Sequence, residues 1–207
     1  MEHFVITIAR QYGSGGRTVG EMLAKKLGIS YYDKQIIHMA SDESGIDVSL
    51  FGKVEEGNSV KKASLFNRTG LYKGDLIPPD SKEFISDENL FNYQAKVIHD
   101  LAEKESFVVI GRCVNYVLKD RPNTLRVFVH APWEFRVEQA MKKISGTREE
   151  VEKFLLKDDK RKQEYYRRFA GGVWNDATNY DLCLNCGKLG FDKCVEAIET
   201  QMNIMRR

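Results

Sequence analysis

The chain has 207 residues, of which 42% are hydrophobic and 30% are charged, and its formal net charge at pH 7 is +2. This length suits one α/β domain with a small insertion, and the nearly balanced charge gives no overall field that favours nucleic acid or a membrane surface. No stretch reaches the roughly 18 apolar residues of a membrane span, and the N-terminal residues lack the features of a signal peptide. We therefore expect a cytoplasmic protein with neither nucleic acid nor membrane as a partner.

Apolar runs alternate with helical patterns, which predicts a mostly parallel sheet covered by helices. Strands are expected at residues 4–9, 29–32, 107–110, 124–130 and 181–185. Helices are expected at residues 17–27, 34–43, 87–104, 112–119, 132–144, 147–169 and 190–206. The run 107–110 is apolar throughout, as expected for a strand buried on both faces.

The first predicted strand leads into a glycine-rich turn and then a helix. Such a turn can hold a polyphosphate, because successive backbone N–H groups point into one concavity and the helix dipole adds positive potential there. The residues expected to bind phosphate are Gly13, Ser14, Gly15, Gly16, Arg17 and Thr18. An ordinary glycine-rich turn between a strand and a helix is the alternative.

The turn matches the P-loop pattern GxxxxGK[ST] imperfectly. Aligning residues 16–18 with its GK[ST] end places Gln11 at the first glycine and Arg17 at the lysine. Arginine can still bridge phosphate oxygens through its planar fork of donors. In this alignment Thr18 is placed to hold Mg²⁺ through its hydroxyl.

Polar residues also follow two other predicted strands. Asp33 comes after the second strand, and Arg112 comes after the strand 107–110. Because ligands bind in the crevice at the carboxyl ends of parallel strands, both side chains should project toward the glycine-rich turn. Asp33 also suits an N-cap of the helix 34–43, and a surface arginine is the alternative for Arg112.

Residues 44–86 contain few apolar residues and are too long for a simple loop in a compact domain. We expect an inserted, mobile subdomain there, with a disordered segment as the alternative. Farther along, Arg136 lies one turn into a predicted helix, where a solvated helix face is the alternative. A basic run covers residues 157–169, with glycines at 171 and 172. It suits either a solvated helix face or a closing lid over 157–172 that excludes water.

The four cysteines show no paired C-x-x-C motifs with zinc spacing. Cys183 and Cys186 form a single C-x-x-C at the end of a predicted strand. We expect all four to be small buried hydrophobic residues rather than redox or metal groups.

Taken together, these features resemble the cytidylate kinase-like family, a branch of the P-loop nucleoside monophosphate kinases. The resemblance covers nearly the whole chain and rests on three blocks. These are ITIARQYGSGGRTVGEMLAKKLGISYYDKQII, QAKVIHDLAEKESFVVIGRCVNYVLKDRPNTLRVFVHAP and DDKRKQEYYRRFAGGVWNDATNYDLCLN.

The resemblance implies a P-loop NTPase three-layer sandwich over residues 1–207, with a five-stranded parallel sheet, a helical acceptor-binding insertion and a lid. It implies transfer of the γ-phosphoryl group of ATP, as the Mg²⁺ complex, to a pyrimidine nucleoside monophosphate. Residues 13–18 would hold ATP, with Thr18 at Mg²⁺, and Asp33 and Arg112 would contact the acceptor. Arg17, Arg136 and Arg161 would stabilise charge on the migrating group.

The chain departs from the family pattern at several positions. Arg17 replaces a lysine, Lys34 replaces a small hydroxyl residue, and Cys113 replaces an aspartate. The resemblance implies CMP or dCMP as the acceptor, and the departures at Lys34 and Cys113 leave another small metabolite as the alternative. A non-catalytic nucleotide-binding regulator is a further alternative, and the sequence leaves the oligomeric state open.

Overall fold

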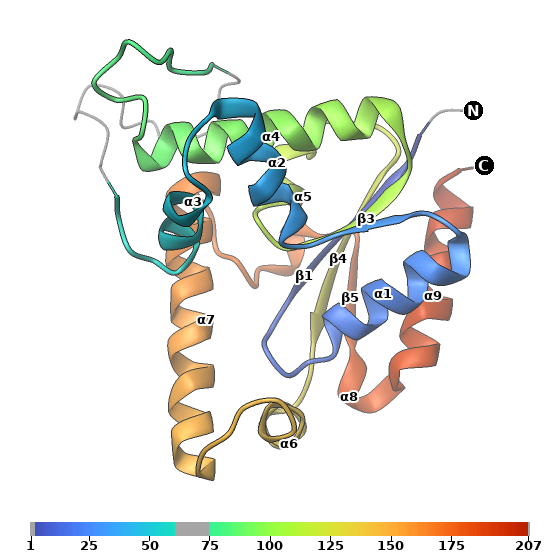
Figure 1. The fold of residues 1–207 in the computed structure, drawn as a ribbon. Helices are drawn as coiled ribbons and strands as arrows, with labels where there is room; N and C mark the ends of the chain where they lie inside the picture. Colours follow the sequence, from blue (N-terminus) through green and yellow to red (C-terminus); the bar gives the residue numbers. More distant parts are fainter. Residues whose placement is uncertain (1–2, 61–74, 207) are drawn as a thin grey trace.

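The computed structural model describes residues 3–60 and 75–206 of the chain. Within these residues five strands form one parallel sheet in the order β2-β3-β1-β4-β5. The strands are β1 (Val5–Arg10), β2 (Ser30–Tyr32), β3 (Phe107–Ile110), β4 (Thr124–His130) and β5 (Leu182–Asn185). Helices cover both faces of the sheet, as Figure 1 shows, which confirms the predicted three-layer α/β fold.

The helices agree with the predicted ones to within a few residues, with three exceptions. They are α1 (Gly16–Leu27), α2 (Gln35–Ser44), α3 (Val48–Glu55), α4 (Asp87–Lys104), α5 (Val114–Val117), α6 (Trp133–Met141), α7 (Arg148–Ala170), α8 (Cys186–Leu189) and α9 (Phe191–Met205). The sequence did not predict α3 or the short α8, and α5 is shorter than the expected helix 112–119. No helix in the described part of the chain is both long and apolar enough to cross a membrane.

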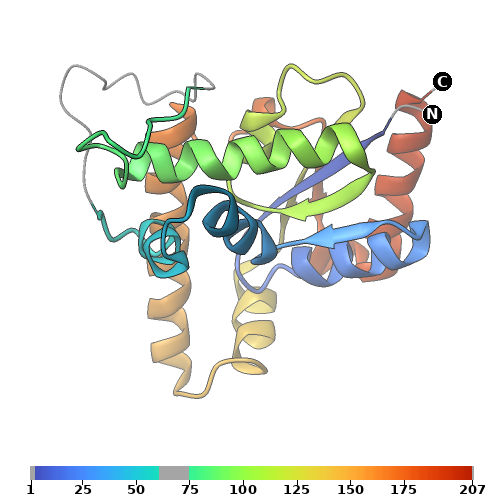
Figure 2. The ribbon, with the colours of Figure 1, turned by 45° about the horizontal axis from the view of Figure 1, so that its top comes forward.

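One face of the sheet is covered by α1 and α9, which lie side by side in Figures 1 and 2. Alternate residues of β1, Ile6 and Ile8, point into this layer and are fully buried. They meet Leu23 of α1 and Ile198 of α9, each on the apolar stripe of its helix. The layer fixes α1, and hence the glycine-rich turn before it, against the end of β1.

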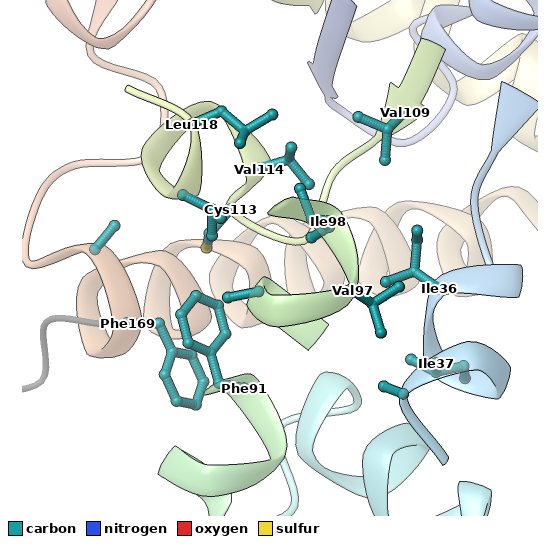
Figure 3. Close-up of a cluster of buried hydrophobic side chains, with 14 of the residues drawn as sticks. Ile36, Ile37, Phe91, Val97, Ile98, Val109, Cys113, Val114, Leu118 and Phe169 are labelled. Atoms are coloured by element: carbon teal, nitrogen blue, oxygen red, sulfur yellow. The ribbon is translucent and has the colours of Figure 1, made fainter. Parts of the chain in front are cut away.

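The other face is covered by α2, α4, α5 and the C-terminal half of α7 (Figure 3). Its centre is an aromatic contact between Phe91 of α4 and Phe169 of α7, whose rings are stacked with centroids 4.5 Å apart. Both side chains are almost completely buried. Truncating a buried phenylalanine to alanine costs about 3–5 kcal/mol, so this contact anchors α7 to the body of the domain.

The N-terminal half of α7 extends away from the sheet beside α6, as Figures 1 and 2 show. It packs against α6 and against Tyr12 of the glycine-rich turn, whose ring centroid lies 5.0 Å from that of Phe154. A small separate core joins the two helices, with Val137 of α6 against Leu155 of α7. Thr147 and Glu150 form a capping box that fixes the start of α7. Gly171 ends the helix in the left-handed conformation, with φ 74°.

The predicted insertion 44–86 begins with α3, which is part of the main core. Asp47 caps this helix by accepting a hydrogen bond from the N–H of Ser49 at 2.8 Å. Phe51 and Val54, one helical turn apart, are buried in the same cluster as α2 and α4. Residues 61–74 of the predicted insertion lie outside the described residues, and its mobility stays a prediction.

Candidate active site

The glycine-rich turn after β1 presents unused backbone donors to the end of the sheet. The hydroxyl of Ser14 donates to the carbonyl oxygens of Gln11 (2.8 Å) and Val129 (3.0 Å), which ties the turn to β4. Helix α1 begins at Gly16 without a side-chain cap. The N–H groups of residues 16–18 donate to no acceptor among the described residues. The turn therefore fits a bound phosphate group, because free N–H groups and the helix dipole converge there.

A pocket of about 210 Å³ opens beside this turn, at the carboxyl ends of β1, β2 and β3. Its cationic lining residues are Arg10, Arg17, Lys34, Arg112, Arg161 and Lys162, and its acidic ones are Asp33 and Glu55. Helix α7 forms the opposite wall, where Tyr165 and Tyr166 line the pocket. The excess of positive charge in a confined space favours a ligand with several negative charges.

Arg112 enters the pocket from an unusual turn after β3. Its Nε donates to the carbonyl oxygen of Asp33 at 2.9 Å, and its guanidinium forms an ion pair with Glu55 of α3. Burial lowers the pKa of Arg112 to about 10. Three consecutive residues, 111–113, have positive φ values of 72°, 57° and 55°. The left-handed turn also explains why α5 begins only at Val114.

Asp33 links the two sides of the pocket. Its Oδ2 lies 2.6 Å from Nη2 of Arg17, so the carboxylate at the end of β2 pairs with the arginine beside the glycine-rich turn. The alternative role of Asp33 as a helix cap is wrong, because Lys34 occupies the N-cap position of α2 and no side chain caps that helix. The structure thus brings Asp33, Arg17 and Arg112 together, as the sequence predicted.

Helix α7 contributes two cations that share one carboxylate. Arg161 Nη2 and Lys162 Nζ each lie 2.6 Å from an oxygen of Asp158, which is buried. Arg161 also donates to the carbonyl oxygen of Glu55, and Lys162 to that of Arg10 at 3.2 Å. Burial, together with the charge of Arg10, lowers the pKa of Lys162 to about 8. The remaining basic residues of the predicted lid, Lys157, Lys160, Arg167 and Arg168, do not line the pocket.

Arg136 lies behind the glycine-rich turn, outside the pocket. Its Nε donates to the carbonyl oxygen of Tyr12 at 2.9 Å. Its two terminal nitrogens form a bidentate pair with Asp159 of α7, at 2.8 and 2.9 Å. The side chain is 4% exposed, and it ties the turn to α7. The structure places the backbone of Arg136 against Gly13 of the turn, but it does not bring the Arg136 side chain into the pocket with the other predicted arginines and Asp33. The catalytic role of Arg136 stays a prediction.

Comparisons with known proteins agree with this geometry. The model of the cytidylate kinase-like family matches residues 5–188. A cytidylate kinase of Methanopyrus kandleri is 24% identical over 202 residues, which cover 96% of this chain and 93% of that protein.

Two solved structures share the fold. A protein from Eubacterium ventriosum superposes with a TM-score of 0.70 at 24% identity, covering 97% of this chain and 99% of that one. A shikimate kinase from Bacteroides thetaiotaomicron gives 0.55 at 12% identity, covering 97% and 98%.

The chain belongs to the cytidylate kinase-like family. The match spans both the glycine-rich turn and α7, so the family and the fold are those of P-loop kinases. The family pattern does not by itself account for the pocket of this chain, because three of the charged residues that line it were not predicted from the sequence.

These missed residues are Arg10, Glu55 and Lys162. Arg10 could have been found, because it is the last residue of β1 and lies on the same face as Ile6 and Ile8. Lys162 lies within the predicted basic run, but only the packing of α7 distinguishes it from its exposed neighbours. No sequence pattern indicated that Glu55 would line the pocket, because the sequence did not predict α3.

The expectation for the cysteines is partly wrong. Cys113, Cys186 and Cys194 are buried, as predicted, but Cys183 is exposed near the edge strand β5. All four thiols are free, and no group of three or more acidic, histidine or cysteine side chains in the described residues could hold a metal ion. A magnesium ion in this family would be held mainly by phosphate and water oxygens, which fits the unpartnered hydroxyl of Thr18 beside the free N–H groups.

Proposed function

We propose that this protein transfers the γ-phosphoryl group of ATP to a nucleoside monophosphate, with CMP or dCMP as the acceptor. The observation that supports this most directly is the cationic pocket between the free N–H groups of the glycine-rich turn and the side chains of Arg112 and Asp33. A phosphate donor and a phosphate acceptor would meet there.

In this proposal residues 13–18 bind the phosphates of ATP through backbone N–H groups, and Thr18 holds the Mg²⁺ ion. Magnesium would supply neutralisation of the charge on the β- and γ-phosphate oxygens. Arg112 would bind the acceptor phosphate, and Asp33 would contact the acceptor nucleotide. Arg112 is held in the pocket by Glu55 and by the backbone carbonyl of Asp33, and the carboxylate of Asp33 is held by Arg17.

The chemical step requires the two substrates to be positioned in line and the negative charge on the transferred phosphoryl group to be neutralised. An oxygen of the acceptor phosphate attacks the γ-phosphorus while the bond to the β–γ bridging oxygen breaks, and ADP leaves. The acceptor phosphate is already ionised, so no general base is required. Arg17, Arg136 and Arg161 would stabilise the charge on the migrating group, and loss of such an arginine can cost on the order of 10³-fold in rate.

We further propose that residues 44–86 form the acceptor-binding part and residues 157–172 a lid. Tyr166 and Phe169 pack the second half of the lid into the core. Closure of the lid would therefore move the core residues that these two side chains contact, together with α7. Both segments should become protected from hydrogen exchange when ATP analogue and acceptor are bound together. Unchanged exchange in the saturated complex would contradict a mobile acceptor-binding part.

The deciding experiment measures ADP release from Mg-ATP in the presence of CMP, dCMP, UMP, AMP, GMP or simple sugars, with an acceptor-free reaction as the control. Turnover with one pyrimidine monophosphate is the expected result. Turnover only with a sugar would support the alternative of a metabolite kinase. No turnover with any member of the panel, with ATP binding still detectable by calorimetry, would contradict CMP or dCMP as the acceptor and favour either an acceptor outside the panel or a regulator.

The variant Arg17→Ala separates an enzyme from a regulator. An enzyme should lose turnover, because Arg17 would act on the migrating charge, whereas a regulator should change only its ligand occupancy. Comparing turnover and ATP affinity of this variant with those of the unaltered chain distinguishes the two.

A further inference from the structure

The backbone of the glycine-rich turn indicates a different alignment with the P-loop pattern from the one that the sequence suggested. Gly15 has φ 92°, a conformation that side chains rarely adopt, so this position requires glycine. Gly16 is already the first helical residue and has no such requirement. If Gly15 is the second glycine of GxxxxGK[ST], Arg10 stands at the first glycine, Gly16 at the lysine and Arg17 at the hydroxyl position, with Thr18 one residue beyond it.

The side chain of Arg10 explains why the lysine position holds a glycine. A Cβ atom added to Gly16 would lie 2.5 Å from Cβ of Arg10 and 3.2 Å from Cβ of Val129. Two side chains cannot occupy this space together. The chain therefore carries a long cationic residue at the end of β1, where the pattern has a glycine, and a glycine at the first residue of α1, where the pattern has a lysine.

Arg10 is also the pocket arginine that has no partner. No acceptor in the described part of the chain lies within hydrogen-bonding distance of its guanidinium, and no ion pair includes it. By contrast, Arg17 pairs with Asp33, Arg112 with Glu55, and Arg161 with Asp158. Burial lowers the pKa of Arg10 even though the Asp33 charge opposes this. An enclosed cation without a partner is costly, which favours an anionic ligand at this point.

The guanidinium of Arg10 lies against Gly111, where any side chain would collide with Nη1. It is thus placed between the glycine-rich turn and the turn that carries Arg112. The charged and titratable groups that face it are Asp33, Arg17, Tyr31, Arg112, Asp158 and Lys162. A ligand anion there would be in reach of both phosphate-binding sides of the pocket.

We propose that Arg10 binds the phosphoryl group that is transferred, replacing the lysine of the P-loop pattern. The proposal rests on the proposed function for the identity of its ligand, a nucleoside triphosphate. The existence of an anion site at Arg10 does not depend on the proposed function, because an inorganic polyphosphate carries the same phosphate groups as a nucleoside triphosphate.

Variants at positions 10 and 16 that move the cationic residue from one position to the other test the proposal. Four proteins are compared: the unaltered chain, Arg10→Gly, Gly16→Lys, and the double variant, which restores the lysine in the space that Arg10 vacates. Affinities for magnesium tripolyphosphate and Mg-ATP are measured by calorimetry, with the thermal unfolding midpoint of each protein. Arg10→Gly should weaken both affinities by about 10- to 100-fold, as expected for lost hydrogen bonds to a charged group. The double variant should regain most of this loss.

Gly16→Lys alone should be destabilised by the collision with Arg10, so Arg10→Met is included as a variant that keeps the volume at position 10. It should fold and still lose polyphosphate binding. Arg206→Met is the matched control, because Arg206 lies over the ring of Phe4 near the C-terminus, away from the pocket. Its affinities should equal those of the unaltered chain.

Unchanged affinity for tripolyphosphate and ATP in both Arg10→Gly and Arg10→Met would overturn the proposal while leaving the proposed function intact. If these variants lose tripolyphosphate binding but the unaltered chain phosphorylates no acceptor, Arg10 is an anion-binding residue and the proposed function fails alone. If the unaltered chain binds neither polyphosphate, both fail together.

Discussion

The neighbouring strands β1 and β3 end side by side at the pocket, and the turns that follow them differ in where left-handed backbone occurs. After β1 the positive φ values fall on Gly13 and Gly15, which adopt them without strain. After β3 they fall on Gly111 and then on Arg112 and Cys113, at about 1–2 kcal/mol for each residue with a side chain.

The difference follows from what each turn presents to the pocket. The first turn lines the pocket with backbone N–H groups, so glycine is sufficient at its left-handed positions. The second turn presents the guanidinium of Arg112, which requires a side chain at a left-handed position. Strain at a functional site persists only when the surroundings fix it, and here the ion pair with Glu55 does so.

Removing that ion pair should have the largest effect on stability. Arg112→Ala should lower the free energy of unfolding by about 3 kcal/mol, because the partly buried carboxylate of Glu55 loses its partner. In the proposed enzyme it should also raise the KM for the acceptor by tenfold or more while the KM for ATP changes little. Denaturant unfolding and steady-state kinetics check both.

The double variant Arg112→Ala with Glu55→Ala is the control for this effect. It should recover part of the lost stability, because no unpaired carboxylate is left. A double variant as unstable as Arg112→Ala would show that the ion pair does not support the turn.

Adding a methyl group to the first turn should have the next largest effect. The Cβ of Gly15→Ala would lie 2.5 Å from the ring of Phe191, in addition to the cost of φ 92°. We expect a loss of about 2–3 kcal/mol in unfolding free energy and a loss of ATP binding.

Gly28→Ala is the matched control, because Gly28 has φ 64° but no atom near its added Cβ. It should lose only about 1–2 kcal/mol and bind ATP normally. Equal losses in the two variants would contradict the role of close packing in the first turn.

Lys162, which donates to the carbonyl of Arg10 from across the pocket, should give a pH dependence. Its lowered pKa of about 8 means that the free enzyme loses this charge as the pH rises through 8. In the proposed enzyme kcat/KM should then fall about tenfold per pH unit above 8. Lys162→Arg should move this fall to higher pH, and a pH profile shared by both proteins would exclude Lys162 as its source.

The same pKa predicts the opposite trend for stability. Between pH 8 and the usual lysine pKa, the unfolded chain binds more protons at this residue than the folded chain, so the unfolding free energy contributed by Lys162 rises with pH. The difference between the unaltered chain and Lys162→Met, measured by denaturant unfolding at pH 7 and pH 10, isolates this contribution.

The smallest expected effect separates strain from packing in the second turn. Cys113→Gly and Cys113→Ala both remove the buried thiol, but only glycine relieves φ 55°. Cys113→Gly should therefore be the more stable of the two by about 1 kcal/mol. If alanine is as stable as glycine there, the left-handed backbone carries no strain at this position.

The sequence by itself determined the five strands, most of the helices, the glycine-rich turn and the family. These follow from local periodicity and short motifs, such as the apolar β3 and the stripe of α9, which depend on residues close together in the chain. The positions of Asp33 and Arg112 followed as well, because the carboxyl ends of parallel strands share one edge of the sheet.

Only the tertiary structure decided which cation meets which partner. The space that Arg10 takes from Gly16 and Gly111, the pairing of Glu55 with Arg112, and the burial of Lys162 join residues far apart in the sequence. No local pattern encodes such contacts, since they depend on packing of α3 and α7 against the sheet. The tertiary structure also left Cys183 exposed on the edge strand β5 and made residues 111–113 a left-handed turn instead of the start of a helix.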